Sequence, residues 1–448
     1  MLYNNTMPTY TSEHLGVRLR VFFELSVVVI SACAACILLS GCRTVLPASG
    51  KTEIVYWTGW SGHEFDVLQK LVDEYNNTHP DVHVRMLSVF GSYQKVRIAF
   101  AGGDTPDVCS AVWAEELAGY AMRGALTPLD GYLAKSGRSL DEWEPGIRDM
   151  VRYHDRTFGL LATVSGDFIV YNKKAFKERN LQPPTNLEEW ARVNDTLTVR
   201  AKDGSYKTYG MRPNGLVLWA YIFGGHWFEP ETGKITATHP KNVEALRFLQ
   251  DFAKKNDIRR MEAFESTFGS METTNGPFFV GKQLLLPTGP WIRQFLNRYA
   301  PKDLEVGAFP YPAPEGGRKM CSNISGSTWV IPAACKNKDE AWEFLEWMMR
   351  PEQNVRFCSQ IGNGSGLTEV ANMPVMTADP LMKLSAEISG GPNAFGPPQM
   401  PVWPAYQAAI ARAEDQAVHG NHDPEVLLKQ VEVKMERELK RVQREAVY

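Results

Sequence analysis

The side chains best suited to binding chemistry in this chain are tryptophans near the ends of predicted strands. The sequence holds twelve tryptophans, and an indole face can stack on the apolar C–H face of a sugar ring whose hydroxyls reach outward to polar groups. In parallel α/β sheets, ligands bind beyond the carboxyl ends of the strands. Each tryptophan alone could equally be buried scaffold, so the prediction is that at least four share one cleft. Seven lie at strand ends or beside Gly and Pro: Trp57, Trp60, Trp113, Trp219, Trp227, Trp291 and Trp403.

The other five tryptophans are expected to be scaffold. Four lie in helical patterns and one in an apolar strand, residues 327–332, where burial is the usual outcome. They are Trp143, Trp190, Trp342, Trp347 and Trp329.

Carboxylates near these tryptophans could suggest glycoside hydrolysis, which needs two acids across the bound sugar. Glu115 and Glu116 are adjacent and point in different directions, and no spacing places a second acid with Asp167. Neither a dinucleotide-binding glycine motif after a strand nor a phosphate-binding loop is found in the sequence. The sequence predicts no catalytic residue, no metal site and no cofactor.

The elements that must position these side chains alternate between strands and helices. Residues 53–57 and 81–87 are predicted strands around a helix whose apolar face runs from Phe65 to Tyr75. Ser61 and Glu64 have capping-box spacing at the start of that helix. Strand, helix, strand predicts an α/β fold with a parallel sheet covered by helices. Further strands are expected at 107–111 and 168–171, and helices at 93–101, 187–199, 242–255, 339–349 and 428–442.

The N-terminal region reads as a secretory signal. Arg18 and Arg20 precede an apolar run over 25–39, which is short for a membrane-spanning helix. The run closes with Leu-Ser-Gly-Cys42, which resembles the bacterial lipobox, whose cysteine is acylated and becomes the mature N-terminus. Residues 1–42 are therefore predicted to be a lipoprotein signal peptide. The alternative is an uncleaved N-terminal anchor.

Composition narrows the class of protein further. The formal net charge is −3 and is unchanged by removing residues 1–42, and no basic tract is present, which argues against a nucleic-acid partner. About 400 mature residues exceed one ordinary core and suggest two domains. The sequence leaves open whether disulfides form among the cysteines outside the signal, Cys109, Cys321, Cys335 and Cys358.

An ordered set of motifs resembles the family-1 extracellular solute-binding proteins of ABC sugar importers. The most specific match is Ile-Val-Tyr-Asn-Lys-Lys-Ala-Phe at 169–176, followed by the segment 181–190. The other matching segments are 99–108, 124–132, 278–282, 288–291 and 339–344, so the resemblance covers nearly the whole mature chain.

The resemblance implies a two-lobe periplasmic-binding-protein fold, type II-like, with a ligand cleft between lobes joined by hinge crossings. By analogy the crossings fall near 163–167, near 324–327, and in or after the helix ending at Met349. Lobe 1 would hold 51–164 plus 327–355, and lobe 2 would hold 165–326 plus 356–448.

The resemblance also implies ligand-binding positions. Trp291, in Gly-Pro-Trp, matches the position where maltose-binding relatives stack a sugar ring. Trp113 lies where relatives present aromatic and acidic groups, so that Glu115 or Glu116 could bond hydroxyls. Ser165 falls where those relatives carry a ligand-contacting glutamate, so Asp167 could substitute for it. The remaining implied positions are Trp57, Trp60, Trp219 and Trp403.

The expected function is therefore that of a monomeric binding protein, lipid-anchored on the outer side of a bacterial membrane, that delivers a sugar or oligosaccharide to the transmembrane subunits of an ABC permease. An alternative within the family is an sn-glycerol 3-phosphate carrier, which would need a basic residue at the cleft. Alternatives from other classes are a secreted carbohydrate-active enzyme and an adhesin or sensor component without a permease.

Overall fold

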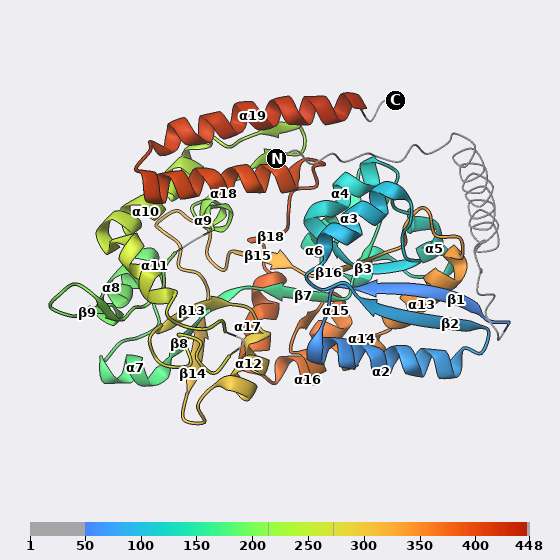
Figure 1. Cartoon of the computed structure of the whole chain (residues 1–448), viewed down its shortest axis with the longest axis horizontal. Helices are drawn as coiled ribbons and strands as arrows, with labels where there is room; N and C mark the ends of the chain where they lie inside the picture. Colours follow the sequence, from blue (N-terminus) through green and yellow to red (C-terminus); the bar gives the residue numbers. More distant parts are fainter. Residues whose placement is uncertain (1–49, 214, 272, 446–448) are drawn as a thin grey trace, which may run out of the picture. The chain divides into compact units, whose positions relative to one another are not determined.

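The computed structural model describes residues 50–213, 215–271 and 273–445 (Figure 1). The predicted signal peptide and Cys42 lie outside this range. The described residues from Thr52 onward form one compact unit. Within the described ranges, no helix is both long enough and apolar enough to cross a bilayer.

The first lobe is built on a five-stranded sheet in the order β2-β1-β3-β16-β6. Strands β1 (Thr52–Thr58), β2 (Val82–Ser88) and β3 (Val108–Trp113) are parallel, as the strand–helix–strand pattern predicted. Strands β16 (Ser327–Val330) and β6 (Leu160–Leu161) join it antiparallel to their neighbours. The carboxyl ends of β1 and β3 carry Trp57 and Trp113, so both tryptophans lie at the same edge of the sheet.

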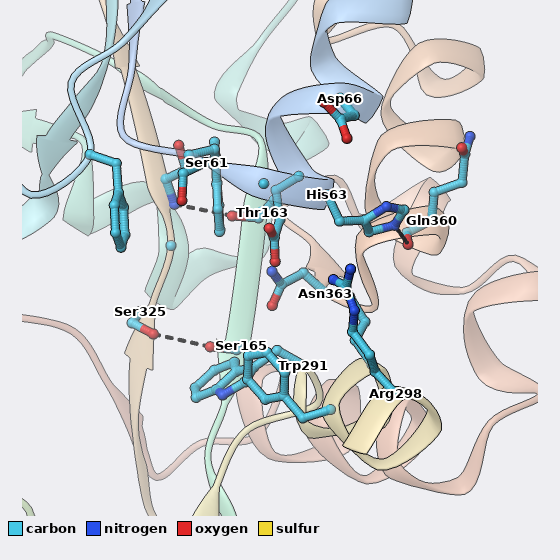
Figure 2. A pocket seen from close by; sticks show the side chains of 18 of the residues that line it. Ser61, His63, Asp66, Thr163, Ser165, Trp291, Arg298, Ser325, Gln360 and Asn363 are labelled. Atoms are coloured by element: carbon cyan, nitrogen blue, oxygen red, sulfur yellow. Dashed lines mark hydrogen bonds between the residues drawn. The ribbon is translucent and has the colours of Figure 1, made fainter. Parts of the chain in front are cut away.

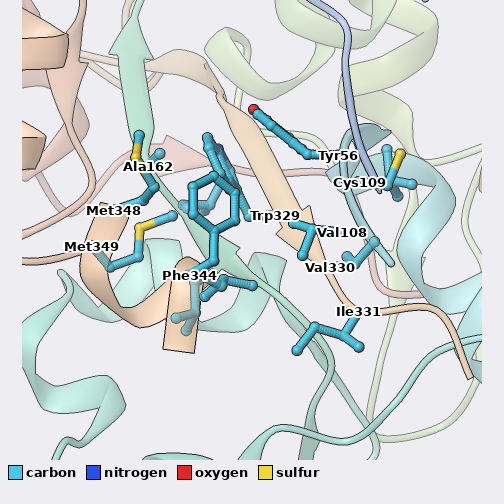
Figure 3. Packing of buried hydrophobic residues seen from close by; sticks show 14 of the residues in the cluster. Tyr56, Val108, Cys109, Ala162, Trp329, Val330, Ile331, Phe344, Met348 and Met349 are labelled. Carbon is cyan, nitrogen blue, oxygen red and sulfur yellow. The ribbon is translucent and has the colours of Figure 1, made fainter. Parts of the chain in front are cut away.

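The core of the first lobe forms where helices cover this sheet. Trp329 is fully buried and stacks on Tyr56 with ring centroids 4.7 Å apart, and Phe344 packs on both rings (Figure 3). Helix α2 (Gly62–Thr78) contributes Leu68 and Tyr75. The other helices of this lobe are α3 (Tyr93–Gly102), α4 (Ala114–Met122), α5 (Asp130–Lys135), α6 (Pro145–Met150), α13 (Lys338–Met348), α14 (Pro351–Ile361), α15 (Thr368–Ala371) and α16 (Pro374–Thr377), with the short 3₁₀ turn η1 (Leu140–Glu142) and the hairpin β4 (Arg152–Tyr153)–β5 (Arg156–Thr157).

The second lobe is built on the antiparallel sheet β13-β8-β14, with strands β13 (Leu285–Thr288), β8 (Phe168–Asn172) and β14 (Val306–Phe309). Its main core gathers Trp190, Trp219 and Trp227, all fully buried. Helices α10 (Pro240–Asn256), α18 (Trp403–Gly420) and α19 (Pro424–Glu445) pack together over it (Figure 1). The other elements are α7 (Lys173–Glu178), α8 (Leu187–Leu197), α9 (Leu216–Ile222), α11 (Ile258–Glu265), α12 (Ile292–Tyr299), α17 (Pro380–Ser389), and the hairpins β9 (Val199–Arg200)–β10 (Tyr206–Thr208) and β11 (Phe228–Glu229)–β12 (Lys234–Ile235).

Two strands connect the lobes. Strand β7 (Thr163–Gly166) leads from β6 toward β8, and β15 (Ser322–Ser325) leads back to β16, so the two run side by side between the sheets (Figure 1). Strands β17 (Gly364–Ser365) and β18 (Ala394–Phe395) complete a small sheet in the order β17-β7-β15-β18. The chain crossings predicted near 163–167 and 324–327 coincide with these strands.

The sequence-based elements are confirmed with end shifts of a few residues, and all five scaffold tryptophans are buried. The predicted capping box was wrong, because the Ser61 hydroxyl makes no cap hydrogen bond. The four cysteines are buried and carry free thiols. Helix α14 runs continuously across the predicted lobe boundary at residue 355, and Phe357 and Ile361 pack in the first core. The exact lobe boundaries stay a prediction.

Candidate ligand-binding cleft

A cavity of about 960 Å³ opens between the carboxyl edge of the first sheet and helix α12 of the second lobe. We call it the main cavity. Figure 2 shows residues of α2, β7, α12 and α14 around it. Its volume is in the range that small-molecule sites occupy. Aromatic side chains from both lobes line it: Trp60, Phe90, Trp113, Trp291, Phe295 and Tyr299.

The first wall is formed by residues at the carboxyl ends of β1, β2 and β3. The Trp60 indole Nε1–H is buried and has no hydrogen-bond partner among the described residues. Phe90, just after β2, is 60 % exposed although it lines the cavity. A buried indole donor without a partner and an exposed ring facing a cavity are both typical of a surface that a ligand covers.

The opposite wall is formed by Trp291 at the start of α12. Its ring folds back over Gly289, where any Cβ would collide with the indole. Glycine at position 289 therefore permits this orientation of the ring, because a larger residue would occupy the space of the indole. The Gln294 amide of α12 also donates a hydrogen bond to the carbonyl of Ile361 at the end of α14, so this wall is tied to the first lobe.

The floor of the main cavity is polar. The hydroxyls of Ser165 and Ser325 lie 3.0 Å apart on the two crossing strands (Figure 2). At one rim, His63 Nε2 is 3.1 Å from the carbonyl oxygen of Gln360, and Asn363 lies beneath them. Hydroxyls and amides between aromatic walls are the groups that hold an uncharged polar ligand in one orientation.

A second cavity of about 530 Å³ adjoins the first and shares Trp113 and Ser325 with it. We call it the side cavity. Its acidic residues are Glu115, at the start of α4, and Asp167, between β7 and β8. Its aromatic lining consists of Trp113, Tyr311, Phe395 and Trp403.

Both acids of the side cavity are held in a poorly solvated environment. Burial raises the pKa of Asp167 from 3.8 to about 7. Burial also raises the pKa of Glu115. A hydrogen bond from a backbone N–H at the start of α4 lowers this pKa, and the negative charge of neighbouring Glu116 raises it further. The pKa of the Tyr311 hydroxyl is raised by its own burial and then by the charge of Asp167.

The structure brings most of the predicted site residues together. Trp60, Trp113, Ser165 and Trp291 line the main cavity, and Trp113, Glu115, Asp167 and Trp403 line the side cavity. Their contact with a ligand stays a prediction.

Two predicted positions lie elsewhere. Trp219 is fully buried in the second core against Trp190 and Phe248, because α10 packs over it. Trp57 lines neither cavity, and its ring lies 4.8 Å from the Lys95 ammonium.

The sequence reasoning overlooked several lining residues. Phe90 follows a predicted strand, so the strand-end rule could have found it. Arg298 and Tyr299 lie on α12 and Asn363 follows α14, and no local pattern marks these positions.

The described residues contain no group of three or more His, Cys, Asp or Glu side chains that could hold a metal ion. The arrangement is a cleft with aromatic walls, a hydroxyl-lined floor and an acidic side cavity.

Comparison with known proteins identifies the family and the fold of this chain. The family model for bacterial extracellular solute-binding proteins matches residues 59–355. The chain is 24 % identical over 401 residues to a maltotriose-binding protein of Pyrococcus abyssi, covering 85 % of this chain and 81 % of the relative. It is 24 % identical over 328 residues to the sn-glycerol-3-phosphate-binding periplasmic protein of Yersinia pestis, covering 68 % and 72 % respectively.

Among solved structures, the protein CpMnBP1 with mannotriose bound superposes with a TM-score of 0.77 at 25 % identity, covering 86 % of this chain and 99 % of that one. The two-lobe fold of the periplasmic sugar-binding proteins is thereby confirmed. Members of this family are extracytoplasmic binding proteins rather than enzymes. This chain belongs to the bacterial extracellular solute-binding protein family.

Proposed function

We propose that this protein captures a sugar or oligosaccharide outside the cytoplasmic membrane and delivers it to the permease of an ABC importer. The observation that carries the proposal is the pair of indole rings, Trp60 and Trp291, on opposite walls of the main cavity. A sugar ring between the walls would contact aromatic faces from both lobes while its hydroxyls meet Ser165 and Ser325. The sugar-binding names of the relatives support the same ligand class.

Transport would follow from a shift between conformations. A ligand that touches both walls favours the closed form in proportion to its extra affinity for that form. The permease subunits would then recognise the closed lobes, and no chemical step on the ligand is required. The hinge would be formed by β7 and β15, which run between the lobes.

The first experiment measures binding. The domain lacking residues 1–42 is titrated by calorimetry against a panel of neutral mono- and oligosaccharides, amino sugars and glycerol 3-phosphate, with thermal denaturation in parallel. A ligand at 100 times its dissociation constant stabilises the folded state by about 2.7 kcal/mol. Saturable binding of one sugar class, lost in Trp291→Ala and kept in Tyr132→Ala, is the expected result. Tyr132 is a suitable control because its half-buried ring stacks on Trp342 and lines neither cavity.

Glycerol 3-phosphate is the second candidate, because the cation Arg298 lines the main cavity, where its guanidinium lies 5.8 Å from the centre of the Tyr299 ring. Glu64 and Asp66 line the same cavity, and their charge disfavours an anion there. Binding of glycerol 3-phosphate that is lost in Arg298→Gln, with no response to any sugar, would contradict the sugar proposal.

The anchor is proposed from the lipobox resemblance. Acylation of Cys42 would hold the domain at the membrane surface, and the full-length protein is expected to fractionate with membranes and incorporate labelled palmitate in a bacterial host. Cys42→Ser should abolish both. Membrane association without label would instead favour the uncleaved anchor.

A further inference from the structure

We propose that the ligand carries a protonated amine, which binds in the side cavity between Asp167 and Glu115. The inference rests on the proposed function and narrows its ligand class from sugars in general to amino sugars. The shared wall at Trp113 lets one ligand place a ring in the main cavity and an amine in the side cavity.

The lining of the side cavity provides no counter-charge for its two acids. No Lys, Arg or His occurs among the described residues that line the side cavity. The nearby cation Arg97 lines an adjoining cavity and is engaged elsewhere, because its guanidinium lies 2.7 Å from the Glu116 carboxylate. Two acids therefore share one cavity without a cationic partner in that lining.

The Asp167 carboxylate also has an unmet hydrogen-bond acceptor. Asp167 Oδ1 is buried and has no hydrogen-bond partner in the described part of the chain. The Asp167 backbone N–H is already used, since it donates to Ser322 Oγ at 2.9 Å. A buried acceptor without a donor is costly, so such atoms usually belong to sites that a missing partner completes.

Aromatic rings line the side cavity together with the two acids. Trp113, Tyr311, Phe395 and Trp403 surround the same space as the two acids. Aromatic faces attract cations, most strongly where water is excluded. Phe395 is held in place by stacking on Tyr221, with ring centroids 3.8 Å apart.

A neutral hydroxyl would satisfy this site less well than an ammonium group. A hydroxyl can donate one hydrogen bond to a carboxylate, but it brings no positive charge, so any acid that is ionised stays uncompensated when the lobes close around the ligand. Burying an unpaired charge is far more costly than burying a paired one. An ammonium group supplies both the donors and the charge.

The test uses matched sugars that differ in one substituent. Glucose, glucosamine and N-acetylglucosamine, their β-1,4-linked dimers and trimers, and the corresponding galactose and mannose series are titrated by calorimetry at pH 7 in an amine-free buffer. In whichever series binds, the amine is expected to bind at least tenfold more tightly than the hydroxyl and N-acetyl forms. Asp167→Asn and Glu115→Gln should each weaken amine binding tenfold or more and change hydroxyl binding less than threefold. Asp303→Asn, which removes an exposed carboxylate that lines neither cavity, should leave the preference for the amine unchanged.

The outcomes separate the two proposals. A neutral sugar that binds as tightly as its amine would overturn the inference and leave the proposed function standing. An amine preference that survives both Asp167→Asn and Glu115→Gln, with melting temperatures showing folded variants, would also overturn it. If no sugar in the series or in the neutral panel binds, the proposed function itself fails.

Discussion

The Ser165 and Ser325 hydroxyls lie 3.0 Å apart on strands that pair antiparallel where the chain crosses between the lobes. Ser165 is buried and Ser325 lies at the junction of both cavities. The same hydrogen bond therefore joins the hinge strands and forms part of the ligand floor. Changes at this pair should alter both stability and binding.

We expect Ser325→Ala to lower the free energy of unfolding by about 0.5–1.5 kcal/mol, because one hydrogen bond is lost and the Ser165 hydroxyl is left buried. Chemical denaturation of Ser165→Ala, Ser325→Ala and the double variant measures the coupling. The double variant should lose less than the sum of the two single variants. Strictly additive losses would show that the two hydroxyls do not interact.

Gly289→Ala tests the orientation of Trp291. The added Cβ would occupy the space of the indole, so the ring must turn away from the cavity wall. We expect sugar affinity to fall about tenfold or more, the scale of one lost anchoring contact. Gly131→Ala is the control, since a Cβ at Gly131 meets no atom within 4 Å. Unchanged affinity in Gly289→Ala would mean that the observed ring position is not needed.

The stability of the unliganded protein should fall between about pH 4 and pH 7 because of Asp167. Its pKa is 3.8 in the unfolded chain and about 7 in the folded protein, so over this range the folded state holds a proton that the unfolded state releases. The other titratable side chains that line the side cavity are Glu115 and Tyr311. Asp167→Asn should reduce the pH dependence of the free energy of unfolding and stabilise the protein at pH 8 by about 1–3 kcal/mol. Melting temperatures from pH 4 to 8 give the comparison, and parallel curves for the two proteins would contradict the prediction.

The Trp329 ring is expected to contribute most to the first core. Trp329→Ala should lower the free energy of unfolding by about 3–5 kcal/mol, because the ring is fully buried against Tyr56 and Phe344. Phe90→Ala, which removes a ring that is 60 % exposed, should change stability by less than about 0.5 kcal/mol. Urea denaturation of both variants measures this, and equal losses would contradict the packing described here.

The four cysteines of the folded domain should not react with thiol reagents. Burial raises the pKa values of Cys109, Cys321 and Cys335 to about 12, so almost no thiolate is present at neutral pH. Reagent uptake by the domain lacking residues 1–42 should appear only after unfolding. A reducing agent should leave the melting temperature unchanged, whereas a drop would reveal a disulfide.

Much of the fold could be predicted from the sequence, because local patterns decide it. The apolar face of α2 and the alternation in β2 follow directly from residue spacing. The site could be predicted only in part. Trp219 and Trp291 both lie near glycines and prolines, so their local sequences look alike. Trp219 belongs to the core and not to the cleft because α10 packs over it. Arg298 and Asn363 reach the cavity through tertiary packing that no short-range pattern encodes.

The placement of the twelve tryptophans gives the molecule a built-in optical reporter. Eight are buried, and seven of these line neither cavity, so their emission forms a background that ligand cannot reach directly. The eighth, Trp403, lines the side cavity. Of the four that are partly exposed, Trp60, Trp113 and Trp291 line the main cavity, and Trp113 also borders the side cavity. A change in intrinsic fluorescence on adding solute therefore reads out occupancy of the cleft without any label, and replacing these three rings one at a time would show which end of the cleft has been filled.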